Sequence, residues 1–175
     1  NTYRDRFVRA HDAFIRMAPR MSFSELGIAP AIVQVLKEQG ITETFEVQAE
    51  AIPAMMQGKD VCCRAPTGSG KTLAFGLPLI SRCKPAHPRY PTALVLTPTR
   101  ELAEQICKVL QPLARPQKLG VMAVYGGTSY AKQRQRLEQG VEIIVACPGR
   151  LIDLMEKGML KLDDVGTVVI DEADR

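Results

Sequence analysis

Two stretches of this chain combine residue types that could bind and cleave a phosphate chain. The first runs from Ala65 to Thr72 and reads Ala-Pro-Thr-Gly-Ser-Gly-Lys-Thr. Gly68 and Gly70 permit backbone torsions that strain other residues, so successive peptide N–H groups can converge on one anion. Lys71 can reach the terminal phosphates, and the Thr72 hydroxyl can ligate Mg²⁺. Ala65 stands where the strict phosphate-loop pattern has glycine, and a Gly/Ser-rich linker is the alternative interpretation; nucleoside triphosphate binding is the better one.

The second stretch is acidic and follows the apolar run Val168-Val169-Ile170. Asp171 emerges where this run leaves the core and, beside Thr72, is the expected second anchor for Mg²⁺. Glu172 can orient and deprotonate an attacking water. The alternative is a charged turn without a function, which the presence of the phosphate loop disfavours.

A regular alternation of apolar runs and helical patterns must position both stretches. An apolar run over residues 60–64 leads into the phosphate loop, and a helix begins after it. Further runs of strand length lie at residues 93–96, 120–125, 142–146 and 168–170, separated by helices through 102–110, 128–139 and 149–157. Continuous apolar strands separated by helices predict an α/β fold, with a parallel sheet sandwiched by helices and right-handed crossovers.

In such a sheet, ligands bind beyond the carboxyl ends of the strands. This rule predicts that residues far apart in the sequence meet at one rim: Lys71, Thr99, Gly126, Cys147 and Asp171.

Two helices are expected before the phosphate loop, over residues 30–39 and about 46–57. Gln48 lies near the start of the second helix, where its amide could present a donor and an acceptor to a purine edge. Taken alone, Gln48 is more often an ordinary surface glutamine. Pro78 is expected to bend the helix after the phosphate loop near Ala74, or to end it early.

Length and composition suit one globular domain, with 175 residues of which 46% are hydrophobic. The predicted organisation is a basic extension over residues 1–20 and a single domain over residues 21–175. Residues 2–18 predict an amphipathic basic helix that packs on its own domain, the alternative being a partner-binding or nucleic-acid-binding extension. Residues 1–20 carry three of the four net positive charges, so overall charge supports nucleic-acid binding only weakly.

No apolar run approaches the roughly 20 residues of a membrane span, and no signal-like region opens the sequence. A cytoplasmic protein without membrane contact is therefore expected. The cysteines lack Cys-x-x-Cys spacing and predict structural thiols in a reducing compartment rather than disulfides or zinc ligands. They are Cys62, Cys63, Cys83, Cys107 and Cys147.

Five motifs follow one another along the chain: Ala65–Thr72, Pro98–Ala103, Gly126–Gly127, Cys147–Arg150 and Asp171–Asp174. In this order they resemble motif I, motif Ia, the double glycine, motif Ib and the Asp-Glu-Ala-Asp tetrad of the DEAD-box RNA helicases. The resemblance covers residues 22–175 and implies the N-terminal RecA-like domain of that family. It further implies ATP and Mg²⁺ as cofactors, with Lys71, Asp171 and Glu172 as catalytic residues.

By this resemblance, Gln48 would read the adenine and Phe23 would stack on it, while Thr72 and Asp171 would hold the metal. The full set of implied nucleotide contacts is Phe23, Gln48, Thr67, Gly68, Ser69, Gly70, Lys71 and Thr72. Where the family usually has Pro-Thr, this chain has Thr44-Phe45, so the turn before Gln48 is expected to differ.

The resemblance also implies contacts to the RNA backbone that do not depend on base identity. They would come from Thr99, Arg100, Gly127, Gly149 and Arg150. Helix starts after Thr99 and Pro148 present free N–H groups to phosphate, which agrees with this assignment. For both arginines the alternative is a surface salt bridge. Cys147 stands where motif Ib usually opens with threonine, so one hydroxyl contact would be lost.

The implied parent protein is an RNA helicase that couples ATP hydrolysis to duplex unwinding or remodelling, with Asp174 in the coupling. A Ser-Ala-Thr motif and a second, C-terminal RecA-like domain with arginine fingers are expected beyond this chain. Because an arginine finger contributes about 10³ to 10⁵ in rate, this chain alone is expected to bind nucleotide weakly and to turn it over little. The alternatives are an ATP-gated RNA clamp for other proteins, whose hydrolysis is incidental, and a DNA-translocating relative.

Overall fold

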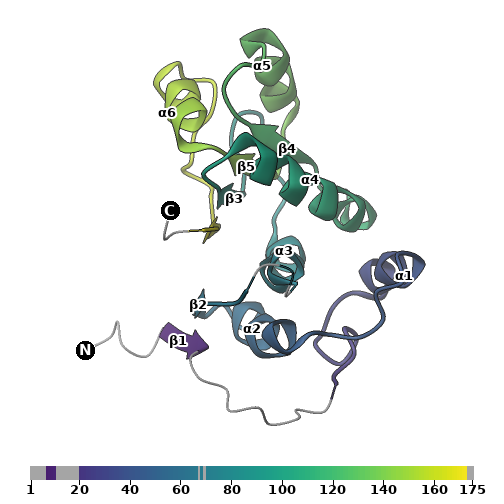
Figure 1. Cartoon of the computed structure of the whole chain (residues 1–175). Helices are drawn as coiled ribbons and strands as arrows, with labels where there is room; N and C mark the ends of the chain where they lie inside the picture. Colours follow the sequence, from purple (N-terminus) through teal and green to yellow (C-terminus); the bar gives the residue numbers. More distant parts are fainter. Residues whose placement is uncertain (1–6, 11–19, 67, 69, 173–175) are drawn as a thin grey trace. The chain divides into compact units, whose positions relative to one another are not determined.

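The computed structural model describes residues 7–10, 20–66, 68 and 70–172. By internal contacts the chain divides into two compact units, residues 1–82 and 83–175, and each unit is described by itself (Figure 1). The sequence predicted a boundary after residue 20 instead, and that domain organisation stays a prediction.

Unit 1 contains the strand and the helix that flank the phosphate loop. Two parallel strands, β1 (Phe7–Ala10) and β2 (Asp60–Cys63), pair with Phe7 opposite Asp60. After the loop, helix α3 (Lys71–Arg82) begins at the predicted lysine. Helix α2 (Glu46–Met56) packs against both β2 and α3. These contacts hold the helix that carries Gln48 next to the two elements that frame the loop.

Helix α1 (Pro30–Glu38) begins at a proline, as suits a first helical position, and buries Ile32, Val33 and Leu36. The chain between α1 and α2 is fixed by Thr44, whose buried hydroxyl donates a hydrogen bond of 2.6 Å to the carbonyl of Met21. The start of α2 is therefore held by tertiary contacts.

Unit 2 is built on four parallel strands, which confirms the predicted α/β class. They are β3 (Ala93–Leu96), β4 (Val121–Val124), β5 (Ile143–Ala146) and β6 (Thr167–Ile170), in the spatial order β4-β5-β3-β6. The last residue of β3, Leu96, lies opposite the last residues of β5 and β6, and β4 also ends opposite the end of β5. All four strands therefore end at one edge of the sheet.

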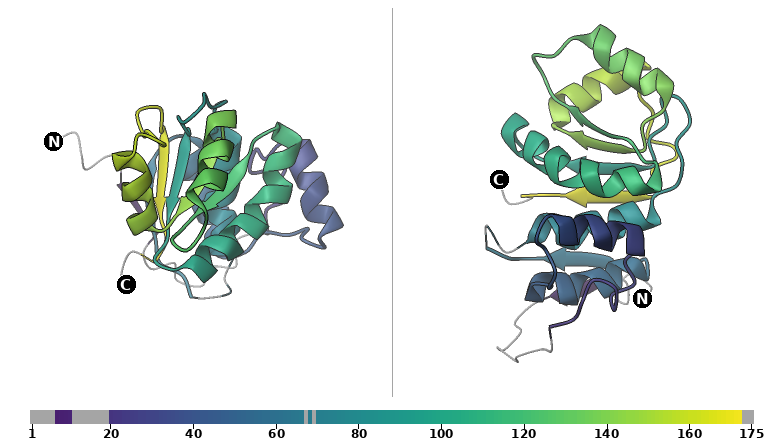
Figure 2. Two further views of the ribbon diagram at one scale, coloured as in Figure 1. Left: turned by 90° about the horizontal axis from the view of Figure 1, so that it is seen from above. Right: turned by 90° about the vertical axis from the view of Figure 1, so that its right-hand side faces the viewer.

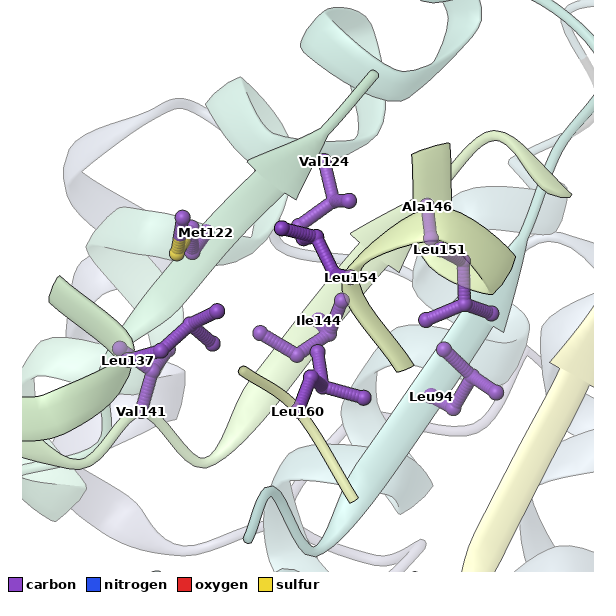
Figure 3. Packing of buried hydrophobic residues seen from close by; sticks show 10 residues of the cluster. All are labelled: Leu94, Met122, Val124, Leu137, Val141, Ile144, Ala146, Leu151, Leu154 and Leu160. Atoms are coloured by element: carbon purple, nitrogen blue, oxygen red, sulfur yellow. The ribbon is translucent and has the colours of Figure 1, made fainter. Parts of the chain in front are cut away.

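Helices cover both faces of this sheet (Figure 2). They are α4 (Arg100–Ala114), α5 (Tyr130–Gln139) and α6 (Pro148–Glu156), and a 3-10 turn, η2 (Arg115–Gln117), follows α4. Alternate strand residues face opposite sides, and one side carries a buried cluster that α5 and α6 cover. Figure 3 shows this cluster: Leu94, Met122, Val124, Leu137, Val141, Ile144, Ala146, Leu151, Leu154 and Leu160. Helix α4 packs on β4 and β5.

The helix predicted over residues 2–18 is wrong where the structure describes that stretch, because residues 7–10 form strand β1. Their backbone groups pair along β2, and such pairing across the sequence outweighs a local helical periodicity. The remainder of the predicted helix lies outside the described residues.

Pro78 does not end the helix after the phosphate loop, because α3 continues to Arg82. A proline inside a helix removes one backbone hydrogen bond. The buried side chains of Leu77, Leu79 and Ile80 in the same turn are buried, so the packing of this turn can offset the missing bond.

Within the described part of the chain, none of the helices combines the length and the apolar character that crossing a bilayer requires.

Candidate nucleotide and RNA sites

The phosphate loop depends on glycine at the two positions that the sequence singled out. Gly68 and Gly70 both have φ of +81°, in the left-handed region that other residues rarely adopt. A Cβ atom on Gly70 would also lie 2.4 Å from Nε2 of Gln48 and 2.7 Å from Cδ2 of Phe45, so space as well as torsion demands glycine there. Thr67 and Ser69, also predicted as contacts, lie outside the described residues.

Lys71 and Thr72 are the first two residues of α3, and both are half-buried. The start of a helix directs unpaired N–H groups and partial positive charge outward, which favours an anion. The carbonyl of Gly70 accepts the first helical hydrogen bond, from the N–H of Ala74 at 3.1 Å. The predicted helix after the glycines is found, but it begins two residues earlier than Leu73, where the sequence placed its start.

Gln48 is buried, with 1% of its surface exposed, so its interpretation as a surface glutamine is wrong. Its Oε1 accepts a hydrogen bond of 2.9 Å from the N–H of Phe45, the residue before α2. Its Nε2 donates one of 3.1 Å to the carbonyl of Gly70. One amide thus joins the start of α2 to the last residue of the phosphate loop.

The aromatic side chain beside the loop is Phe45 rather than Phe23. Phe23 is 1% exposed, so a base could stack on its ring only after the ring had moved. Phe45 is 59% exposed, and its ring lies against Gly70. The sequence reasoning noticed Phe45 only as a departure from the family pattern and gave it no role; an aromatic residue three positions before Gln48 was the available signal.

The carboxyl edge of the unit 2 sheet brings together the predicted RNA contacts. The first residue after each of β3, β5 and β6 donates a backbone hydrogen bond to the last residue of a neighbouring strand. The N–H of Thr97 donates to Ala146, that of Cys147 to Val124 and that of Asp171 to Leu96, at 2.8–3.0 Å. From one side to the other, the rim thus consists of the loops after β4, β5, β3 and β6.

Most of the predicted RNA contacts on this rim are open to solvent. Thr99, Arg100, Gly127 and Gly149 are exposed. Thr99 precedes α4, and its hydroxyl accepts a hydrogen bond of 3.3 Å from the N–H of Leu102. Gly127 has φ of +83°, and no atom lies within 4 Å of the position that a Cβ would take. The backbone of this loop is therefore exposed and is not covered by a side chain at Gly127.

Arg150 is different, because only 10% of its side chain is exposed. Its Nη1 donates to the carbonyl of Thr128 at 2.9 Å and to Oε1 of Gln133 at 3.0 Å. Its guanidinium carbon lies 4.1 Å from the centre of the Tyr130 ring. Arg150 therefore connects α6 to the double-glycine loop through its hydrogen bond to Thr128.

Gln133 is a residue that sequence reasoning missed. It is buried, with 5% exposed, and its Nε2 donates to the Thr128 hydroxyl at 2.5 Å. It lies four residues before the buried Leu137, so helical spacing already placed it on the inner face of α5.

Asp171 and Glu172 follow β6 and are half-buried. Glu172 has φ of +54°, an uncommon backbone conformation for a residue with a Cβ, of the kind that persists where surrounding structure imposes it. Asp174, the predicted coupling residue, lies outside the described residues. The shared rim is thus found for Thr99, Gly126, Cys147 and Asp171 within unit 2, while the meeting of Lys71 with Asp171 stays a prediction.

A hollow of about 460 Å³ lies at the other edge of the unit 2 sheet, before β4. Its lining includes Arg115, Lys118 and Arg136, and it includes none of the predicted site residues. The predicted site residues of unit 2 therefore lie away from this hollow.

A phosphate loop between a strand and a helix, together with parallel strands that end in an acidic pair, defines the class of phosphate-loop nucleotide-binding proteins. The family model for the DEAD/DEAH box helicase matches residues 45–175. The chain belongs to the DEAD/DEAH box helicase family.

Individual relatives agree with this assignment. The chain is 42% identical to the RNA helicase CrhR of a Synechocystis species over 87% of its length, and 42% identical to the mitochondrial DEAD-box ATP-dependent RNA helicase 9 of Arabidopsis thaliana over 89%. These matches span 31% and 26% of the two relatives, so the chain corresponds to about a quarter to a third of their length.

Two solved structures share the fold. A DEAD box protein of Methanococcus jannaschii matches with a TM-score of 0.80 and 33% identity, covering 88% of this chain and 42% of that one. A hypothetical ATP-dependent RNA helicase of Sulfolobus tokodaii matches with a TM-score of 0.74 and 42% identity, covering 82% of this chain and 41% of the other.

Proposed function

We propose that this chain is the nucleotide-binding and RNA-binding part of an ATP-dependent RNA helicase. The observation that carries the proposal is the rim of unit 2, where Thr99, Gly127 and Gly149 are exposed at the same sheet edge as Asp171 and Glu172. A protein that couples ATP hydrolysis to RNA remodelling needs its polyanion contacts and its hydrolytic groups on one rigid support.

The phosphate loop suits ATP because its two glycines, both with φ of +81°, allow backbone N–H groups to converge on a phosphate at the start of a helix. The Thr72 hydroxyl and the Asp171 carboxylate are oxygen donors, the ligand type that Mg²⁺ prefers, and these two residues would hold the ion. When bound, Mg²⁺ would neutralise charge on the phosphates. Lys71 would bind the terminal phosphates, and Glu172 would accept a proton from the attacking water.

The base is proposed to contact Gln48 and Phe45. Gln48 uses one donor and one acceptor within unit 1, and an amide offers two N–H donors and two acceptor lone pairs, so an adenine edge could still pair with it. Phe45 offers an exposed ring beside the same loop, which suits stacking better than the buried Phe23.

RNA binding is proposed through backbone contacts at Thr99, Arg100, Gly127 and Gly149, with Arg150 ordering the loop beside them. Helix starts and bare glycine backbone recognise phosphate rather than base identity, so affinity should fall with salt and show little sequence preference. Asp174 and a second RecA-like domain are proposed to couple this surface to hydrolysis. A cytoplasmic location is also proposed, although similar helicases include a mitochondrial and a chloroplastic protein.

The test measures ATP turnover and strand separation by the intact protein, with and without RNA. We expect turnover to be stimulated by RNA more than by DNA, and duplexes to separate in the presence of ATP. Glu172→Gln should bind ATP and RNA but fail to turn ATP over, whereas Glu156→Gln, an exposed change on α6, should behave as wild type. Stimulation without strand separation would favour the RNA clamp. Undiminished turnover by Glu172→Gln would show that the base has been misassigned.

A further inference from the structure

Two tyrosines bracket the double-glycine loop, and each lies over an arginine from a different helix. The guanidinium carbon of Arg100, the first residue of α4, lies 4.8 Å from the centre of the Tyr125 ring. That of Arg150, near the start of α6, lies 4.1 Å from the centre of the Tyr130 ring. The exposed Gly126 and Gly127 lie between the two tyrosines in sequence.

Each tyrosine hydroxyl donates a hydrogen bond to a carboxylate on the same helix as its arginine. Tyr125 donates to Oε1 of Glu104, four residues after Arg100. Tyr130 donates to Oδ2 of Asp153, three residues after Arg150. The same arrangement of arginine, carboxylate and tyrosine thus occurs twice, once on each side of the loop.

This arrangement matters because arginine and a carboxylate three or four residues apart on a helix normally pair with each other. Among the described residues Arg100 makes no ion pair, and Glu104 bonds to Tyr125 instead. The Nε atom of Arg150 lies 3.8 Å from Oδ2 of Asp153, beyond hydrogen-bonding distance, while Asp153 bonds to Tyr130 and Lys157. The Tyr125 hydroxyl thus occupies the carboxylate that would otherwise neutralise Arg100, whereas Asp153 keeps a long ion pair with Arg150.

We infer that Tyr125 and Tyr130 are positioning residues for RNA binding, an inference that rests on the RNA surface proposed above. Each ring fixes an arginine by a cation–π contact, and the Tyr125 hydroxyl also holds Glu104 away from Arg100. Arg100 is thereby presented with its N–H donors available to a phosphate, and Arg150 is fixed where it orders the double-glycine loop. The loop is held from both ends by the two helices whose starts would receive the RNA backbone.

The test is the affinity of the intact protein for a fluorescent oligouridylate, measured with a non-hydrolysable ATP analogue at several salt concentrations. Tyr125→Phe keeps the ring but releases Glu104, which can then pair with Arg100. We expect binding to weaken about two- to fivefold, the range of an exposed ion pair. The double variant Tyr125→Phe, Glu104→Gln should recover wild-type affinity, since no carboxylate is left to compete.

Tyr90→Phe is the matched control. The ring of Tyr90 also lies near a cation, with Nζ of Lys161 5.6 Å from its centre, but both residues precede strands and so lie at the other edge of the sheet. This variant should bind RNA as wild type does. A loss equal to that of Tyr125→Phe would mean that the effect is not specific to the rim, and would overturn the inference.

Arg100→Ala separates this inference from the proposed function. If Arg100→Ala binds RNA as tightly as wild type, the proposed RNA surface is wrong and the inference fails with it. If Arg100→Ala weakens binding but Tyr125→Phe does not, or if Glu104→Gln fails to rescue, the RNA surface stands and the positioning role is wrong. Rescue would support the role, because removing the charge of Glu104 would not restore RNA binding to a variant whose tyrosine was needed only for folding.

Discussion

Replacing the side-chain amide of Gln48 with a carboxyl group tests the hydrogen bonds that link α2 to the phosphate loop. In Gln48→Glu, the oxygen that accepts the hydrogen bond from the N–H of Phe45 is kept. The Nε2 atom, which donates to the carbonyl of Gly70 at 3.1 Å, is replaced by an oxygen. The variant loses one hydrogen bond, worth about 1 kcal/mol, and leaves a buried acceptor facing another, which costs about 1–3 kcal/mol. We expect a loss of about 2–4 kcal/mol in the free energy of unfolding near neutral pH.

The same geometry predicts the pH dependence of that loss. A protonated carboxyl group can donate to Gly70, so the folded state of the variant favours the proton and raises the pKa of the new group. A group whose pKa is higher in the folded than in the unfolded state stabilises below its unfolded value and loses that contribution as pH rises. The deficit of Gln48→Glu should therefore be smaller near pH 5 than near pH 8.

Urea unfolding followed by far-ultraviolet circular dichroism suits this measurement, because the chain contains no tryptophan. Gln34→Glu is the matched control, since Gln34 is exposed on α1 and, within the described part of the chain, its Nε2 donates to Glu38 alone, at 3.2 Å. It should change stability by no more than about 0.5 kcal/mol. If Gln48→Glu were as stable as Gln34→Glu near pH 8, or if its deficit did not shrink on acidification, the role assigned to this amide would be refuted.

Three further predictions concern other parts of the chain. Phe45→Ala should weaken ATP binding by the intact protein several-fold without changing its unfolding midpoint, as measured by nucleotide titration and urea unfolding; equal affinity would exclude stacking. Burial raises the pKa of Cys107 to about 12. The stability that this thiol contributes is therefore complete below the unfolded pKa of about 8.5 and is lost progressively as the pH rises from there towards 12. The difference in melting temperature between wild type and Cys107→Ala should narrow over this alkaline range. Hydrogen bonds from Lys157 and Tyr130 lower the pKa of Asp153. Asp153→Asn should therefore be less stable than wild type at neutral pH, and the two should approach equal stability once the pH falls below the ordinary aspartate pKa of about 3.9. Thermal melts recorded across pH measure this difference.

The parts of the fold that depend on repetition could be predicted from the sequence. Strand β3 was predicted at Ala93–Leu96 and is found there, because a short, fully apolar run between turn residues has few alternatives. The prediction of parallel strands also predicts the rim, because parallel strands in register bring the loops that follow them to one edge of the sheet. Thr99, Gly126, Cys147 and Asp171 meet there for that reason.

The parts that depend on individual polar contacts could not be predicted. Nothing in the sequence near Gln48 indicates that its amide reaches Gly70, 22 residues later, because that bond exists only when α2 packs against α3. Arg150 was assigned to the RNA backbone from its motif, with a surface salt bridge as the alternative, yet its hydrogen-bond partners Thr128 and Gln133 come from another loop and another helix. A hydrogen-bond partner far along the chain is fixed by packing, which local patterns do not encode.

The two helix starts on the rim show what the departure at Cys147 changes. At α4, the Thr99 hydroxyl accepts a hydrogen bond from the N–H of Leu102, satisfying one of the unpaired donors of the first turn. At α6, Cys147 occupies the corresponding position and makes no such bond from its side chain. The start of α6 is nevertheless fixed, because Pro148 sets the first helical torsion, the N–H of Cys147 bonds to Val124 at 2.8 Å, and Arg150 anchors the next residues to the double-glycine loop. The replacement therefore leaves the backbone of the rim in place and frees N–H groups of the first turn that a threonine would have capped, and those are the groups that a phosphate would use.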